Sequence, residues 1–534
     1  MRREPVSRPA PVDAASAKRR GLVLAIGVVL VGVALRLPAL FVSILNEDEA
    51  LYSAGAAALA TGEPLYQAVT DNKPPGIFWL YRAACELVGR YDLRAIHALT
   101  LVWVLVAGGL VARVAMLLVP IERRGPAGLT ASLLYFVYTT VQEPRVLATQ
   151  PEILFTLPLA GAAWMLCRAE GSRSALAWTF GAGALSALAT VLKLTAISFL
   201  ASACLWFVVV RPLLDRRRPA LARVAALVAG FAAIWVIVWR ILVSDAAWDD
   251  FLFWALRYNA LVYVPGAGNW AKVGRFVIAF LPWMALWAVP WWLAVRLVVR
   301  SLRRRDIAMA GPVSLLAVWT VAATLVICVG GRYFDQYFPA AVPPLAILAG
   351  ASVGELGLPR WQRRLAGIGV AIPALLAALS GAFFEDSVAL FDARRPSIRT
   401  LTTYIDGTTA RSDRIFVWGM YPAIYVDSDR LAGSRWVGCQ FLTGYGAFGL
   451  GRDLAPEIED RAQAPGGFDR LIDDLERRRP ALFIDTAQAG LGHMRRYPLE
   501  RYPRLSEYVR STYRREVVVE GAVVYRRRAV PLPR

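Results

Sequence analysis

An acidic run stands at residues 46–49, where Asn46 is followed by Glu47, Asp48 and Glu49. It comes directly after a long apolar run, so its carboxylates are expected beside one face of a membrane. A carboxylate there can accept the proton of an acceptor hydroxyl while that hydroxyl attacks the anomeric carbon of a sugar. We select Asp48 for this role. The structural alternative is a helix N-terminus, because Asn46 and Glu49 have the spacing of a capping box and acids stabilise that end of a helix.

Fixed cations that could hold a phosphate are found further along the chain. A glycosyl phosphate leaves as an anion, so such a site needs positive charges near the departing oxygens. Lys73 stands in the stiff segment 72–75, which ends in two prolines, and Arg332 stands in the polar aromatic segment 330–337. Both have a structural alternative, since lysines snorkel to the membrane surface and aromatic segments anchor helices there.

Further ionisable residues lie at the ends of apolar runs. Glu152 could hold the acceptor, assist the base or ligate a divalent metal, but with Thr149 it also fits a capping box. Lys193 and Arg94 are charges inside or at the edge of apolar segments, where a charge indicates function by default. His97 is expected to be packed or hydrogen-bonded rather than a ligand.

These residues must be positioned by membrane helices. The chain of 534 residues is 57% hydrophobic, and crossing a hydrocarbon core takes roughly 20 apolar residues. We expect a polytopic α-helical membrane protein with about eleven transmembrane helices. The expected spans are residues 21–45, 93–119, 125–142, 151–167, 175–192, 196–213, 222–243, 273–298, 308–329, 338–356 and 365–384.

The charge distribution predicts which loops face outward. The net charge of +20 is spread over short loops between apolar runs, which indicates a membrane surface rather than a nucleic acid partner. By the positive-inside rule the basic tail 1–20 is cytoplasmic, while the loop 46–92 and the segment 385–534 face outward. Nucleotide sugars and ATP are cytoplasmic, so an outward-facing transfer enzyme must take its donor from the membrane. A polyprenyl-phosphate sugar follows as the expected donor.

After residue 384 the hydrophobicity falls and short β-rich runs appear. We expect strands at residues 414–419, 423–428, 481–485 and 517–526, with a helix at 468–478. This predicts a small α/β domain outside the membrane. Five cysteines without a CxxC pair and two histidines give no pattern typical of a disulfide framework or a histidine-rich metal centre.

The motifs at residues 48–52, 62–66 and 71–75, with the order of the spans, resemble bacterial relatives of the protein O-mannosyltransferases and the lipid A aminoarabinose transferases. These are membrane enzymes of the GT-C fold. The resemblance implies that the transmembrane domain, residues 21–384, carries its active site in the first outer loop. It also implies Asp48 and Glu49 as the catalytic pair, with Asp48 as the base, and Lys73 as a contact to the carrier-lipid phosphate.

The resemblance extends more loosely to other positions. Glu152 falls where the family often has a second acid, and Arg332, Tyr333 and Tyr337 fall in its late outer loop, where they would contact the donor phosphate. Several relatives have Asp at the position of Glu152, so metal use is left open; a divalent metal would be expected at Glu152 and Asp48. The further candidate residues are Tyr66, Asp71, Arg94 and Lys193.

The expected activity is transfer of one sugar, with inversion, from a polyprenyl-phosphate donor to an acceptor hydroxyl at the outer face of a bacterial cytoplasmic membrane. The acceptor, whether glycan, lipid or protein, is not specified. A transporter or lipid flippase of envelope glycan precursors is the alternative from another class, but it would be expected to show repeated halves and midplane binding residues. We find no internal repeat. A polymerase or ligase acting on a lipid diphosphate carrier is a further alternative.

Overall fold

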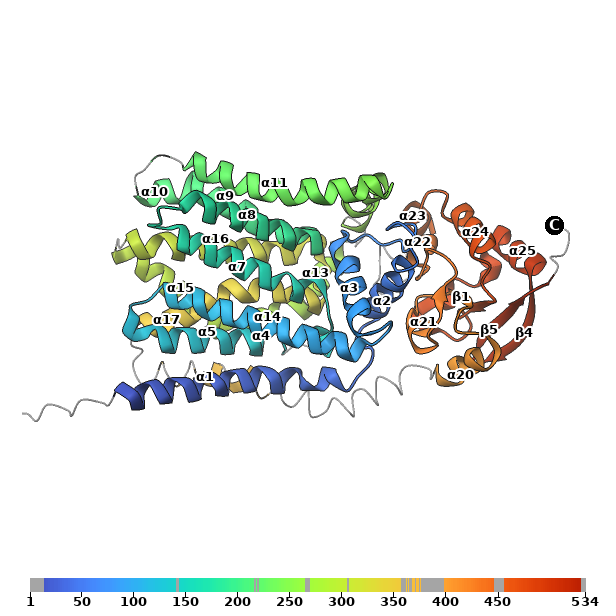
Figure 1. The fold of residues 1–534 in the computed structure, drawn as a ribbon, viewed down its shortest axis with the longest axis horizontal. Helices are drawn as coiled ribbons and strands as arrows, with labels where there is room; N and C mark the ends of the chain where they lie inside the picture. The colour runs from blue at the N-terminus through green and yellow to red at the C-terminus, as the bar shows by residue number, and fades with distance from the viewer. Residues whose placement is uncertain are drawn as a thin grey trace, which may run out of the picture.

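The computed structural model describes residues 14–140, 144–215, 218, 220–264, 269–304, 307–356, 362, 364, 367–369, 371–373, 375, 398–445 and 456–529. A bundle of long helices fills one end of the molecule and a small sheet domain the other (Figure 1). The expected combination of a helical membrane part and a C-terminal α/β unit is therefore confirmed.

The bundle is built from apolar helices joined by short helical segments. Its helices are α1 (Ala14–Arg36), η1 (Leu37–Leu40), α4 (Leu93–Leu117), η2 (Ile121–Arg123), α5 (Arg124–Tyr138), η3 (Pro144–Leu147), α6 (Pro151–Leu154), α7 (Thr156–Ala169), α8 (Ala175–Leu192), η4 (Leu194–Ala196), α9 (Ile197–Leu205), η5 (Trp206–Val210), α10 (Arg211–Asp215), α11 (Leu221–Ser244), α12 (Trp248–Phe251), η6 (Leu252–Tyr263), α13 (Asn269–Arg275), η7 (Phe276–Phe280), α14 (Leu281–Leu286), α15 (Ala288–Arg304), α16 (Ile307–Cys328), η8 (Val329–Gly331), η9 (Asp335–Ala341) and α17 (Val342–Leu356).

The protein is a multi-pass membrane protein. Among the described residues, eight helices are long and apolar enough to cross a membrane. A pair bent by 64°, Lys272–Leu286 with Ala288–Arg304, adds a ninth if it forms one span. The expected count of about eleven is not confirmed, because α5 has only 15 residues and the run 365–384 lies largely outside the described residues.

Helices α8 and α11 pack closely because each has a glycine where they cross. A Cβ atom on Gly183 would lie 1.9 Å from the carbonyl oxygen of Leu227, and one on Gly230 would lie 1.9 Å from that of Phe180. In lipid, helix association depends on van der Waals packing, which small residues improve by letting backbones approach. A larger side chain at either glycine would push the two helices apart.

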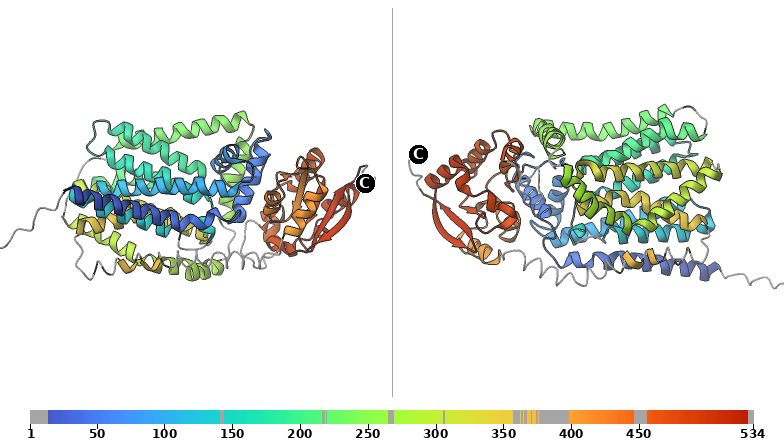
Figure 2. Two further views of the ribbon diagram at one scale, coloured as in Figure 1. Left: turned by 60° about the horizontal axis from the view of Figure 1, so that its bottom comes forward. Right: turned by 180° about the vertical axis from the view of Figure 1, so that it is seen from behind.

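The segment expected as the first outer loop contains α2 (Glu47–Leu59) and α3 (Gly76–Val88), which lie between the bundle and the sheet domain in all views (Figures 1 and 2). The Asn46 side chain caps α2 by accepting a hydrogen bond of 2.9 Å from the backbone N–H of Asp48. The alanine-rich remainder of α2 is buried. This helix therefore presents its acidic first turn where the bundle meets the sheet domain.

The sheet domain contains five strands in the order β2-β1-β3-β5-β4. The pairs β1–β2 and β1–β3 are parallel, whereas β3–β5 and β4–β5 are antiparallel. Its elements are α20 (Arg399–Thr408), β1 (Arg414–Trp418), α21 (Ala423–Asp427), β2 (Leu431–Ala432), α22 (Gln440–Thr443), α23 (Pro456–Ala462), α24 (Gly467–Arg478), β3 (Leu482–Asp485), η11 (Leu491–Arg496), η12 (Leu499–Arg501), α25 (Pro503–Thr512), β4 (Tyr513–Val519) and β5 (Ala522–Arg527).

Two expected strands differ from the structure. Residues 423–428 form the helix α21, which starts after Pro422 and is held by a bond of 2.9 Å from the Val417 N–H to the Tyr425 hydroxyl. Residues 517–526 are a hairpin rather than one strand, because Glu520 and Gly521 both have positive φ, as a tight β-turn requires. The strands expected at 414–419 and 481–485 and the helix at 468–478 are confirmed as β1, β3 and α24.

Candidate active site

Glu49 joins three segments through its buried carboxylate. Its Oε2 accepts a hydrogen bond of 3.1 Å from the Leu45 N–H. Its Oε1 accepts from the Thr149 N–H and lies 2.9 Å from His97 Nε2. The other ring nitrogen of His97 lies 2.7 Å from the carbonyl oxygen of Ala39. Both partners of the ring are acceptors, which fits an imidazolium paired with a carboxylate, and Glu49 thereby fixes the start of α2 against α4.

Asp48 has a different environment from its neighbour. It is half-buried, and its carboxylate makes no hydrogen bond or ion pair with any residue that the structure describes. Burial raises the pKa of the Tyr52 hydroxyl, and the carboxylates of Asp48, Asp71 and Glu152 raise it further. Carboxylates of α2, of the turn at Asp71 and of α6 therefore all act electrostatically on the hydroxyl of Tyr52, a residue of α2.

Lys73 is held in a tight turn of the first loop. Its Nζ lies 3.2 Å from Asp71 Oδ1, and the same oxygen accepts a bond of 3.0 Å from the Lys73 N–H. The Tyr66 hydroxyl donates to the Lys73 carbonyl at 2.9 Å, and the ammonium lies 5.3 Å from the centre of the Tyr52 ring. Burial lowers the pKa of Lys73, but the carboxylates of Asp71 and Asp48 outweigh burial and raise it. The ammonium is thus a permanent positive charge at this position.

A second charged pair comes from two bundle helices. Lys193 follows the last residue of α8, and its Nζ forms an ion pair with Oε1 of Glu152 in α6. The same ammonium lies 4.3 Å from the centre of the Tyr337 ring, whose hydroxyl is 2.9 Å from that of Tyr263. The other oxygen of Glu152 is buried and has no hydrogen-bond partner among the described residues.

The capping box expected from Thr149 and Glu152 is wrong. Gln150 is the residue that precedes α6, and no side chain caps this helix. The Thr149 hydroxyl instead lies 2.8 Å from the hydroxyl of Thr100 in α4, while Glu152 is engaged by Lys193. Glu152 therefore has no capping role.

Arg332 is buried beside the second pair. Its guanidinium lies 3.8 Å from the centre of the Tyr263 ring and donates a bond of 2.9 Å to the Tyr263 carbonyl. The following residue, Tyr333, has a positive φ of 48°, and its ring packs against Phe276 and Phe280. Arg332 therefore faces the Tyr263–Tyr337 pair, whereas Tyr333 joins the aromatic side chains of η7.

The structure brings together most of the residues selected from the sequence. Those near Tyr52 or in the adjoining Tyr337 cluster are Asp48, Tyr66, Asp71, Lys73, Glu152, Lys193, Arg332 and Tyr337. Arg94 is not among them, because it is exposed at the start of α4 and makes no hydrogen bond or ion pair with the part of the chain that the structure describes. Glu49 borders this site, but its carboxylate is occupied by the bundle.

Three residues of the site were not selected from the sequence: Tyr52, Asn259 and Tyr263. Asn259 exchanges bonds with Asn72, accepting from its amide at 2.8 Å and donating to its carbonyl at 2.7 Å. This contact joins η6 to the turn that holds Lys73. The only signal in the sequence was that both Asn259 and Tyr263 fall between the expected spans 222–243 and 273–298.

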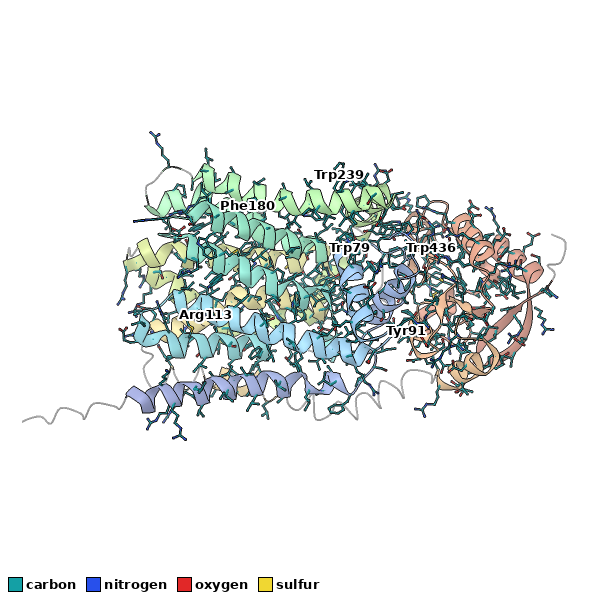
Figure 3. All side chains as sticks on the ribbon, viewed as in Figure 1. Trp79, Tyr91, Arg113, Phe180, Trp239 and Trp436 are labelled. Atoms are coloured by element: carbon teal, nitrogen blue, oxygen red, sulfur yellow. The ribbon has the colours of Figure 1, made fainter. Side chains whose placement is uncertain are left out.

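The sheet domain covers this end of the bundle. The Arg435 carbonyl accepts a bond of 2.8 Å from the Thr70 N–H, and the Tyr258 hydroxyl donates to the Ala462 carbonyl at 3.0 Å. Arg478 of α24 forms an ion pair with Glu63. Figure 3 shows Trp436 on the side of the sheet domain that faces α2 and α3. The domain therefore fixes the segment that leads to Asp71 and Lys73.

The donor set does not by itself form a metal site. Among the described residues there is no group of three or more His, Cys, Asp or Glu side chains placed to hold a metal ion. Of the two expected ligands, Glu152 already has Lys193 as its partner. A cation here would need further ligands from substrate or water.

The fold and the arrangement of helices define a polytopic membrane protein of the GT-C type. The whole chain is similar to ArnT from Cupriavidus metallidurans bound to undecaprenyl phosphate, with a TM-score of 0.59, 14% identity, and coverage of 98% of this chain and 100% of that one. The apo state of the same ArnT gives a TM-score of 0.59 with 16% identity and coverage of 94% and 98%.

Two further comparisons refine this relationship. Residues 72–239 match the family model described as dolichyl-phosphate-mannose-protein mannosyltransferase. The oligosaccharyltransferase of Archaeoglobus fulgidus tethered to an acceptor peptide with the NVT sequon has a TM-score of 0.51 and 12% identity, covering 97% of this chain and 76% of that one. No curated protein shows significant similarity. The expected resemblance is confirmed for the protein O-mannosyltransferases by the match over residues 72–239, and for ArnT by the fold.

Proposed function

We propose that this protein is a glycosyltransferase that moves a single sugar from a polyprenyl-phosphate donor to an acceptor hydroxyl at the outer face of a bacterial cytoplasmic membrane. The observation that carries the proposal is the carboxylate of Asp48, which has no partner among the described residues and lies beside the Asp71–Lys73 pair. A carboxylate that is free of protein partners can accept a proton. The solved ArnT bound to undecaprenyl phosphate supports the choice of carrier.

Each side chain has a separate role in the proposed reaction. Asp48 accepts the proton of the acceptor hydroxyl, whose oxygen forms the new bond to the anomeric carbon. The bond between that carbon and the phosphate oxygen breaks, and its electron pair leaves with the polyprenyl phosphate. Lys73 faces the departing phosphate, with Arg332 and Tyr337 as further contacts. Attack opposite the phosphate inverts the anomeric centre.

Charge placement explains why no general acid is required. A phosphate monoester is a stable anion once a fixed cation faces it, so the site stabilises the developing charge without donating a proton. Lys73 suits this role because its carbonyl, backbone N–H and ammonium are all held by neighbouring groups. A pre-oriented cation needs no reorganisation when the negative charge develops.

The test is lipid mass spectrometry on cells that lack the protein and are complemented with wild type, Asp48→Asn or Glu122→Gln. The control Glu122 is exposed at the end of the bundle remote from the site. With Asp48→Asn we expect one polyprenyl monophosphate sugar to accumulate at normal protein abundance, because the amide loses basicity, and transfer in vitro to fall about 100- to 10,000-fold. Glu122→Gln should behave as wild type.

Other results would point elsewhere. An unchanged lipid pool with an Asp48→Asn protein that is fully active in transfer would remove Asp48 as the base. An unchanged lipid pool in cells that lack the protein, with no transfer by wild type in vitro, would favour transport. A pool of long glycans on a lipid diphosphate carrier would identify a polymerase or ligase instead. Loss of protein abundance with Asp48→Asn would show that this carboxylate is needed for folding.

A further inference from the structure

An open groove of about 570 Å³ lies along α15, away from the residues described so far. Its apolar part is formed by Trp292, Val295 and Val299, which are exposed on the outer side of the helix. The opposite side of α15 packs into the bundle through the buried Leu293 and Leu297. The groove is therefore a surface that faces the lipid.

The arginines of the groove lie in the last three turns of α15. They are Arg296, Arg300, Arg303 and Arg304. Among the residues that the structure describes, one carboxylate faces them, since Glu355 lies 3.8 Å from Arg300 and 3.4 Å from Arg304. Within this described part, four guanidinium groups against one carboxylate leave a charge of +3. The Nε of Arg300 is buried and has no hydrogen-bond partner among the residues that the structure describes.

The groove lies at the end of the bundle opposite the Asp48 site. Glu355 is near the C-terminal end of α17, whereas Tyr337 belongs to η9, which precedes that helix. The Gly354 carbonyl accepts a hydrogen bond from Arg123, which comes shortly after the C-terminal end of α4. Arg113, near that end of α4, lies far from the sheet domain (Figure 3). A ligand in the groove is therefore separated from the transfer site by the length of the bundle.

We propose that this groove binds one anionic phospholipid of the leaflet at this end of the bundle. The phosphate would be bound by the arginines, and an acyl chain would lie along Trp292, Val295 and Val299. Val295 and Arg303 are eight residues apart, or about 12 Å along a helix, which fits a headgroup and the upper part of its chain. Basic residues next to an apolar surface at the membrane boundary are the chemistry that recognises anionic lipids.

The test is native mass spectrometry of the full-length protein in detergent, titrated separately with phosphatidylglycerol, with zwitterionic phosphatidylcholine and with a polyprenyl monophosphate. We expect one phosphatidylglycerol to bind at least about tenfold more tightly. The variant Arg296→Gln/Arg300→Gln/Arg303→Gln should weaken that binding about 100-fold. The control Lys18→Gln/Arg19→Gln/Arg20→Gln removes the same charge from exposed residues of α1 and should leave binding unchanged.

A second variant separates lipid binding from folding. Val299→Trp fills the apolar part of the groove but keeps all four arginines, so it should also release the bound phosphatidylglycerol. If the arginine variant does not fold, binding to Val299→Trp alone tests the proposal. Equal binding of phosphatidylcholine, or equal loss in the α1 control, would overturn the proposal. So would tighter binding of a polyprenyl monophosphate, because the groove would then hold the carrier lipid. None of these outcomes bears on Asp48.

Discussion

Lys193 and Glu152 form a partly buried ion pair, and the Lys193 ammonium also lies 4.3 Å from the centre of the Tyr337 ring. The pair joins the end of α8 to α6 and faces η9, so it connects three segments that are distant in the sequence. One oxygen of Glu152 is left without a partner among the described residues. The pair can therefore act as a structural link and also offer an acceptor atom to a substrate.

Single and paired substitutions separate these two roles. Lys193→Met leaves a buried carboxylate without its cation and should destabilise the protein by about 3–5 kcal/mol. The double variant Glu152→Gln/Lys193→Met removes both charges and should recover much of that stability. If the pair contributes to the site, transfer stays lost in the double variant. Thermal unfolding in detergent and a transfer assay measure the two effects, and full recovery of transfer would restrict the pair to a structural role.

Lys73 should control affinity for the lipid donor. Lys73→Met removes a charged contact to the phosphate and should raise the KM for the donor about 10- to 100-fold, since such a contact is worth about 1.5–3 kcal/mol. Lys73→Arg keeps the charge and should retain part of the affinity. Steady-state kinetics with a polyprenyl-phosphate sugar give the comparison. A reduced kcat at unchanged KM would mean that Lys73 acts only on the charge that develops in the transition state. Unchanged kcat and KM would instead place Lys73 away from the phosphate.

Glu49→Gln should reduce stability rather than chemistry. The amide cannot form the ion pair with His97. Its NH2 group is a donor, whereas the backbone N–H groups of Leu45 and Thr149 both require an acceptor at this side chain. We therefore expect the free energy of unfolding to fall by about 1–3 kcal/mol. Transfer per folded molecule should stay near the wild-type value. Thermal unfolding combined with an activity assay on the folded fraction checks this. A stable but inactive Glu49→Gln protein would show that Glu49 takes part in the reaction.

The stability of the sheet domain should depend on pH through Asp485. Burial at the end of β3 raises the pKa of Asp485 from 3.8 to about 6, against the lowering effect of the Ala487 N–H. A raised carboxyl pKa means that the native state binds the proton more tightly than the unfolded state does. The stability that this proton contributes is complete below pH 3.8 and is lost as the pH rises through about 6.

Asp485→Asn should remove this dependence. A rise of the pKa from 3.8 to about 6 corresponds to about 3 kcal/mol, so the variant should be more stable than wild type by up to that amount above pH 7. At pH 3.5 the two proteins should be equally stable. Hydrogen exchange at β3 and β5 as a function of pH measures the difference. A constant difference between the two proteins would contradict the assignment to this carboxyl.

The sequence by itself determined the class of fold and the location of the site. Apolar runs long enough to cross a membrane can form only helices there, because every backbone group must be hydrogen-bonded internally. Asn46 and the acids after it fixed the start of α2, since capping is a local interaction. The cluster of charges in loop 46–92 predicted the position of the candidate site, where we propose that the chemistry occurs.

Only the tertiary structure decided what each charge does. Adjacent residues on a helix point about 100° apart, so Asp48 and Glu49 could not share one environment, but the packing of α2 against α4 decided that Glu49 would meet His97. Lys193 pairs with Glu152, 41 positions away in the sequence, because α6 and the end of α8 lie next to each other in the structure. Such pairings depend on which helices lie side by side, which local patterns of residues do not encode.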